Sequence, residues 1–78
     1  MTRIEVLGTG CAKCKRLYAN VQEAIKALGI EAEVVKVDSI DELVERGIMS
    51  TPALYVDGTL RISGRVSTVD EIKRMLQG

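Results

Sequence analysis

The sequence predicts a single α/β domain, in which a four-stranded mixed sheet is flanked by three helices in the order β-α-β-α-β-β-α. Short apolar runs typical of strands alternate with stretches whose apolar residues recur every three or four positions, as on one face of a helix. The last two strand-like runs are separated by only two residues, which indicates a hairpin rather than a helical crossover. Because 78 residues make one small domain, we expect residues 1–78 to fold as one unit.

The first half of the chain has the pattern of a strand, a helix and a second strand. Residues 3–7 form the first predicted strand and residues 32–37 the second. Residues 12–28 between them carry the apolar stripe of an amphipathic helix, made by Leu17, Val21, Ala24, Ile25 and Leu28. Gly29 stands where helices commonly end. Since a helix joins them, the two strands should be parallel with a right-handed crossover.

Both later helices begin with a capping box, which is a Ser or Thr followed three residues later by Glu. Ser39 and Glu42 open a short helix that ends at Gly47. Thr68 and Glu71 open the last helix. The apolar residues that we expect these helices to bury are Ile40, Leu43 and Val44 in the first, and Val69, Ile72, Met75 and Leu76 in the second.

A hairpin is predicted between these two helices. Residues 53–56 and 59–62 are short apolar runs joined by Asp57-Gly58, a pair that favours a two-residue turn between antiparallel strands. Three large side chains are interpreted as packing residues of the core or its edge, the usual role at such spacing: Tyr18, Met49 and Met75.

Charge and aromatic content exclude two classes of partner. Eleven basic and eleven acidic residues give a formal net charge of zero, and the aromatic residues are Tyr18 and Tyr55. Without a basic surface or stacking platforms, the chain is not expected to bind nucleic acid.

No apolar run approaches the roughly 20 residues of a membrane span. The first residues lack the pattern of a secretion signal, so we expect a cytoplasmic protein without a membrane partner.

The two cysteines, Cys11 and Cys14, stand three residues apart between the first strand and the first helix. The unpaired N–H groups and the positive dipole end of a helix N-terminus favour a thiolate, which is the nucleophile in disulfide exchange. Nearby cations favour it further: Lys13, Lys15 and Arg16. We therefore expect Cys11 to attack a disulfide. Cys14, one turn into the helix, is expected to resolve the mixed disulfide that results.

Three motifs, together with the order of elements, carry a resemblance to a known family. They are the Cys-x-x-Cys motif at 11–14, Thr51-Pro52 before the third strand, and Ser63-Gly64 after the fourth. Over essentially its whole length the chain resembles the thioredoxin fold, and especially the small glutaredoxin-like, "redox-active disulfide" members of that superfamily. The residues alone favour an ordinary loop proline that opens a strand. The resemblance implies instead that Pro52 follows a cis peptide bond and faces the dithiol. It also implies that Thr51, Pro52 and Gly64 bind the substrate, with the Thr51 backbone pairing to a substrate strand.

The resemblance also draws attention to Glu5 and Lys36. Glu5 lies six positions before Cys11, the offset at which thioredoxin has a buried acid. The resemblance implies that Glu5 assists proton transfer at the inner thiol and that Lys36 pairs with it. A carboxylate desolvated near a thiol suits general acid–base chemistry. The residues alone allow another interpretation, an exposed Glu–Lys pair of little consequence.

These observations predict a thiol–disulfide oxidoreductase that reduces protein disulfides, with the reversible Cys11–Cys14 disulfide as its redox centre and no other cofactor. Glutathione-binding glutaredoxins end the fourth strand with Gly-Gly and follow it with an acidic cap. This chain has Ser63-Gly64 there, and its first acid after that is Asp70, which resembles the glutaredoxin-like proteins that thioredoxin reductase reduces. We therefore expect a thioredoxin-reductase-like reductant rather than glutathione, disulfide-containing proteins as substrates, and a monomer.

Two other function classes stay open at this point. The first class is a copper- or zinc-binding module of the metallochaperone type, because the same thiolates are soft metal ligands. Against it, a closed zinc site needs four ligands, and the chain has no His and no further Cys. Metallochaperones also have Met two residues before the first Cys, where this chain has Thr9. The second is a structural domain whose cysteines are incidental.

Overall fold

The computed structural model describes residues 2–8 and 12–77. The secondary structure follows the predicted order. Its elements are β1 (Thr2–Leu7), α1 (Ala12–Leu28), β2 (Ala32–Val37), α2 (Ile40–Glu45), β3 (Ala53–Val56), β4 (Thr59–Ser63) and α3 (Val69–Gln77). None of the helices in these ranges has the length and apolar character needed to cross a membrane.

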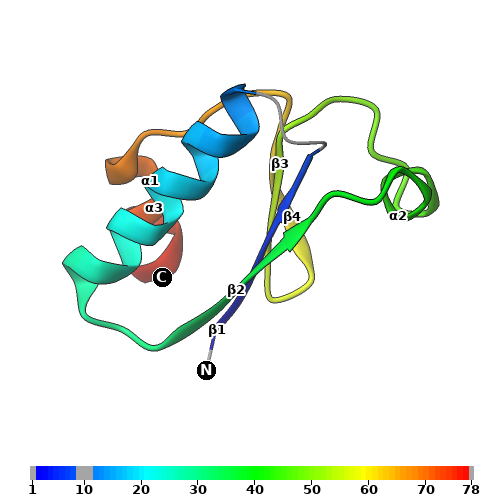
Figure 1. Cartoon of the computed structure of the whole chain (residues 1–78). Helices are drawn as coiled ribbons and strands as arrows, with labels where there is room; N and C mark the ends of the chain where they lie inside the picture. Colours follow the sequence, from blue (N-terminus) through cyan, green and yellow to red (C-terminus); the bar gives the residue numbers. More distant parts are fainter. Residues whose placement is uncertain (1, 9–11, 78) are drawn as a thin grey trace.

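The four strands form one mixed sheet in the order β2-β1-β3-β4. The β1–β2 pair is parallel, as predicted for strands joined by a helix, and the other two pairs are antiparallel. Figure 1 shows α1 and α3 together on one side of the sheet and α2 on the other. The central position of β1 gives it a helix-covered environment on both faces.

Alternation along β1 divides its side chains between these two layers. Ile4 and Val6 belong to the larger core cluster, which they share with buried residues of α1 and α3. Leu7 faces the opposite way and packs with Leu43 of α2 and Ala53 of β3. Glu5 shares the face of Leu7, so this strand carries a carboxyl group into the smaller α2 layer.

The hairpin between β3 and β4 confirms the prediction from Asp57-Gly58. Both turn residues have positive φ, +50° at Asp57 and +83° at Gly58, as a two-residue turn of this hand requires. The turn is also tied to β1, because the Arg3 backbone N–H donates to Asp57 Oδ1 at 2.8 Å. Strand β4 extends one residue beyond the predicted run, to Ser63.

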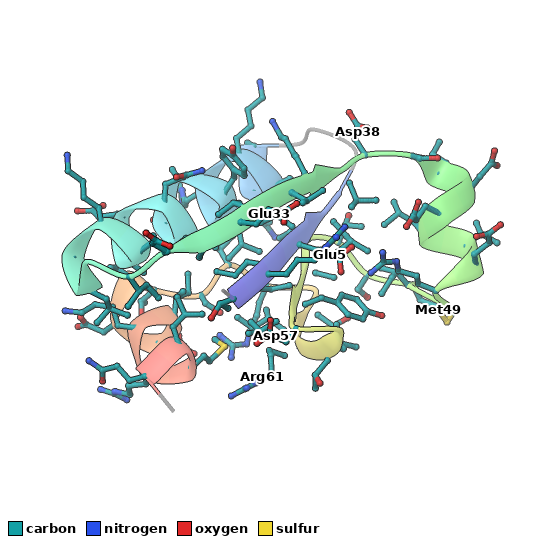
Figure 2. All side chains as sticks on the ribbon, turned by 90° about the horizontal axis from the view of Figure 1, so that it is seen from below. Glu5, Glu33, Asp38, Met49, Asp57 and Arg61 are labelled. Carbon is teal, nitrogen blue, oxygen red and sulfur yellow. The ribbon has the colours of Figure 1, made fainter. Side chains whose placement is uncertain are left out.

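The prediction that α2 buries three apolar residues is wrong. Leu43 is buried, but Ile40 is 66% exposed and Val44 is 71% exposed. Neighbouring helix positions are about 100° apart, so a single-turn contact through Leu43 leaves Val44 pointing away from the sheet. Met49, also interpreted as a packing residue, is 96% exposed, and Figure 2 shows it at the edge of the molecule in the loop after α2.

The two predicted capping boxes also differ. At α3 the box is formed: the Glu71 N–H donates to Thr68 Oγ1 at 3.2 Å, and the Thr68 N–H donates to the Glu71 carboxylate at 3.4 Å. A hydrogen bond from Arg65, with a smaller contribution from the Thr68 N–H, lowers the pKa of Glu71. At α2, Ser39 makes no side-chain capping bond, which corrects the prediction for that helix.

This contrast predicts unequal effects of two matched substitutions. Thr68→Ala should lower the free energy of unfolding by about 1 kcal/mol, because it removes a formed N-cap bond. Ser39→Ala should change it by less than about 0.5 kcal/mol, the usual range for a surface substitution that removes no bond. Urea unfolding followed by circular dichroism measures both values. Equal losses in the two variants would contradict the assignment of the caps.

Candidate functional site

The structure packs Cys14 against the carboxyl end of β1. Its side chain is 2% exposed in the first turn of α1, directly over Gly8. A Cβ atom added to Gly8 would overlap Cys14 Sγ, and it would lie 3.9 Å from the Thr51 Cβ. Gly8 therefore lies between Cys14 and Thr51, and the absence of a side chain there lets all three come together. Cys11, the other predicted thiol, is outside the described residues.

Gly8 is a residue of this candidate site that the prediction from the sequence did not include. The signal was a glycine three residues before the first Cys of the pair. Its backbone N–H donates to the Val37 carbonyl at 2.9 Å, which extends the β1–β2 ladder by one bond. The backbone under Cys14 is therefore held by the sheet.

The segment before β3 approaches the same place. The Thr51–Pro52 peptide bond is cis, the isomer that the resemblance implies, and the Pro52 side chain is fully buried. The Gly64 N–H donates to the Pro52 carbonyl at 2.9 Å. Gly64 has a φ of +78°, and an added Cβ would lie 2.9 Å from the Ser50 Cβ. The structure thus brings Gly64, Pro52 and Thr51 together through backbone contacts.

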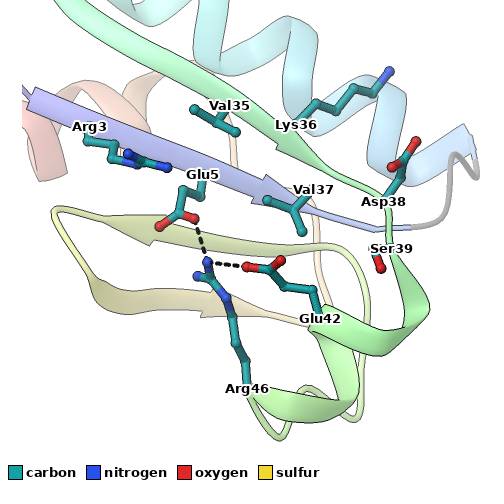
Figure 3. A pocket seen from close by; sticks show the side chains of 9 residues that line it. All are labelled: Arg3, Glu5, Val35, Lys36, Val37, Asp38, Ser39, Glu42 and Arg46. Carbon is teal, nitrogen blue, oxygen red and sulfur yellow. Dashed lines mark hydrogen bonds and ion pairs between the residues drawn. The ribbon is translucent and has the colours of Figure 1, made fainter.

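Glu5 is buried, with 6% of its surface exposed, and its carboxylate is paired with Arg46. The Arg46 Nη2 atom donates to Glu5 Oε2 at 2.6 Å and to Glu42 Oε1 at 2.8 Å (Figure 3). These bonds, the one to Glu5 first, raise the pKa of Arg46 well above its ordinary value, so the guanidinium stays charged. Its centre also lies 5.0 Å from the ring centroid of Tyr55.

The predicted pairing of Glu5 with Lys36 is wrong. In the β1–β2 register Glu5 stands beside Val35, while Lys36 stands beside Val6 and points to the opposite face of the sheet. The Lys36 side chain is exposed, and its Nζ lies 5.2 Å from the ring centroid of Tyr18 on α1. Figure 3 shows Lys36 directed away from Glu5. The cation beside Glu5 is instead Arg46, which follows the last residue of α2.

A cavity of about 320 Å³ opens beside this ion pair, between the sheet and α2. Its lining includes Glu5, Asp38, Glu42 and Arg46 (Figure 3). Within residues 2–8 and 12–77, no three His, Cys, Asp or Glu side chains are grouped so that they could hold a metal ion. The arrangement at the end of β1 offers sulfur chemistry, since the Cys14 thiol lies there over Gly8, and Thr51, the residue before Pro52, lies close to the same glycine.

Comparison with known proteins agrees with this arrangement. A family model described as a thioredoxin domain matches residues 2–77. The thioredoxin of Methanothermobacter thermautotrophicus is 47% identical over 76 residues, which cover 97% of this chain and 99% of that protein. The thioredoxin of Methanocaldococcus jannaschii is 40% identical over 77 residues, which cover 99% of this chain and 88% of that protein.

A solved structure shares the fold at much lower sequence identity. It is that of thioredoxin-2, described as a component of the malaria parasite protein secretion machinery, with a TM-score of 0.75 and 13% identity. The likeness covers 99% of this chain and 82% of that one. The curated relatives support an oxidoreductase role of the thiol–disulfide type. Since the family model and both relatives extend over nearly the whole sequence, the chain belongs to the thioredoxin-domain family.

Proposed function

We propose that this protein is a small thiol–disulfide oxidoreductase that reduces disulfides in other proteins. Its redox centre is the reversible Cys11–Cys14 disulfide, and it uses no further cofactor. The observation that carries the proposal is the packing of Cys14 Sγ over Gly8, next to Thr51 and the cis bond to Pro52. The thioredoxin relatives supply the reaction type.

The proposed reaction has two exchange steps. The Cys11 thiolate attacks one sulfur of the substrate disulfide, forms a mixed disulfide and releases the first substrate thiolate. The Cys14 thiolate then attacks the Cys11 sulfur, which closes the Cys11–Cys14 disulfide and releases the second substrate thiolate. Two electrons pass from the protein to the substrate. Each departing thiolate takes up a proton unless its pKa lies below the ambient pH.

Thr51, Pro52 and Gly64 are proposed to bind the substrate. The backbone of Thr51 would pair with an extended substrate strand next to the thiols. Support comes from the position of Thr51, whose Cβ would lie 3.9 Å from a Cβ added to Gly8, and from the hydrogen bond between the Gly64 N–H and the Pro52 carbonyl. That bond fixes the segment from the β4 side.

The partners and setting of the reaction belong to the same proposal. The reductant is a thioredoxin-reductase-type enzyme rather than glutathione, because Ser63-Gly64 stands where glutathione-binding glutaredoxins have Gly-Gly, and no acid follows it before Asp70 to hold the glutathione amine. The protein acts in the cytoplasm as a monomer. The zero formal net charge argues against nucleic acid or an anionic membrane as a partner.

A redox titration of the wild-type protein tests the proposal. After equilibration in glutathione buffers of graded potential, thiols are alkylated and the mass of the protein is measured. We expect a single two-electron transition between a doubly alkylated and an unmodified form, and the Cys14→Ser variant should lack it. If Cys11 and Cys14 never form an intramolecular disulfide, the proposed oxidoreductase function is refuted. Stoichiometric zinc bound by the thiols without any exchange would favour the metal-binding alternative.

A further inference from the structure

We propose that Arg46 is a positioning residue for exchange with protein disulfides. In this proposal its ion pair to Glu5 fastens α2 to β1 and so fixes the segment that leads to Thr51 and Pro52. The inference rests on the proposed function, and it adds a residue that neither the Cys-x-x-Cys motif nor the proline loop contains.

One guanidinium joins three elements of the fold. Arg46 Nη2 donates to Glu5 of β1 at 2.6 Å and to Glu42 of α2 at 2.8 Å. The same group lies over the ring of Tyr55 in β3, at 5.0 Å. The bond to Glu5 is short and charge-assisted, and the Glu5 side chain is only 8% exposed, so solvent screens the pair weakly.

Helix α2 needs such a tie because its apolar contact with the sheet is small. It has six residues, and Leu43 is the one that is buried. Ile40 and Val44, which could have widened the contact, are 66% and 71% exposed. A helix this short has little stability of its own and keeps its place through tertiary contacts. Arg46 therefore supplies a large part of what holds α2 to the sheet.

The position of α2 sets the position of the proline segment. Arg46 caps the helix through its backbone N–H to the Glu42 carbonyl at 3.1 Å, and Thr51 follows five residues later. The far end of the segment is fixed where Gly64 donates to the Pro52 carbonyl. The near end is fixed by the ion pair of Arg46 with Glu5 and by the partly buried Ile48, which packs against the cluster of Leu7, Leu43 and Ala53. Between them Met49 and Ser50 are exposed, so a displaced α2 would carry Thr51 away from Cys14.

The test compares two substrates of different size. Arg46→Met should lower kcat/KM for reduction of a protein disulfide such as insulin by about tenfold, since sub-ångström misplacement of a docking strand is costly. Reduction of a small aromatic disulfide, which needs no strand pairing, should change by less than about twofold. Arg46→Lys should recover part of the protein-disulfide rate because it restores the charge. Arg74→Met is the matched control, because Arg74 is exposed in the last turn of α3, and it should leave both rates unchanged.

A second variant guards against unfolding. Glu5→Gln combined with Arg46→Met removes the tie without leaving a buried unpaired charge. Its loss of kcat/KM with the protein substrate should be at least as large as that of Arg46→Met. Because Glu5 is itself expected to assist proton transfer at Cys14, an unchanged rate with the small disulfide is required of Arg46→Met alone. Equal loss of Arg46→Met with both substrates, or no loss with either, would overturn the positioning role while wild-type exchange persists. Absence of exchange in the wild type would instead remove the proposed function, and this inference with it.

Discussion

Cys11→Ser is expected to abolish disulfide reduction, with a loss of about a thousandfold or more, because it removes the attacking nucleophile. Serine is nearly the same size as cysteine, but its hydroxyl does not ionise near neutral pH and cannot form a mixed disulfide. The measurement is the rate of insulin reduction with a chemical dithiol as electron source.

Cys14→Ser is the matched variant for this experiment. It should also stop turnover, but at a different step, because Cys11 can still attack while nothing resolves the product. A mixed disulfide between Cys11 and the substrate should therefore accumulate and be visible by mass spectrometry. A Cys11→Ser protein that still reduces insulin would refute the assigned roles. If Cys11→Ser changes only the amount of metal that the protein binds, the thiols are metal ligands.

Gly8→Ala is expected to have the second largest effect. Its new Cβ would overlap Cys14 Sγ and lie 3.1 Å from the Cys14 Cβ. The backbone cannot retreat easily, since the Gly8 N–H is bonded to the Val37 carbonyl. We expect a loss of about 1–3 kcal/mol in the free energy of unfolding, the usual cost of overpacking. Urea unfolding measures it, and disulfide exchange should slow as the sulfur is displaced.

A double-mutant cycle isolates the cause of that loss. In a Cys14→Ala background the sulfur is gone, so Gly8→Ala should cost clearly less than in the wild type. Some cost should remain, because the Cβ at position 14 is still close. Equal cost in both backgrounds would mean that Gly8 acts through its backbone alone and not by making room for the sulfur.

The strands and helices could be predicted because their signals are local. The apolar stripe at 12–28 matches α1 (Ala12–Leu28), and Asp57-Gly58 marks the turn between β3 and β4. Periodicity and turn chemistry are properties of neighbouring residues, and here they agree with the tertiary packing.

The site was only partly accessible from the sequence, because its contacts are long-range. Arg46 and Glu5 are 41 positions apart, and no local pattern relates them. Lys36 was misassigned because a strand alternates faces, so a neighbour one position along points to the other side of the sheet. The role of Gly8 depends on how closely α1 approaches the end of β1, a distance that spacing along the chain does not give.

The placement of β1 between β2 and β3 has a consequence for biosynthesis. Of the four strands, β1 is synthesised first, and both of its edges are paired in the folded sheet. Its antiparallel partner, β3, ends at Val56. Strand β1 can therefore be paired along both edges only after the chain has been synthesised through Val56. Until then the carbonyl and amide groups on its β3 edge remain hydrated in the nascent chain.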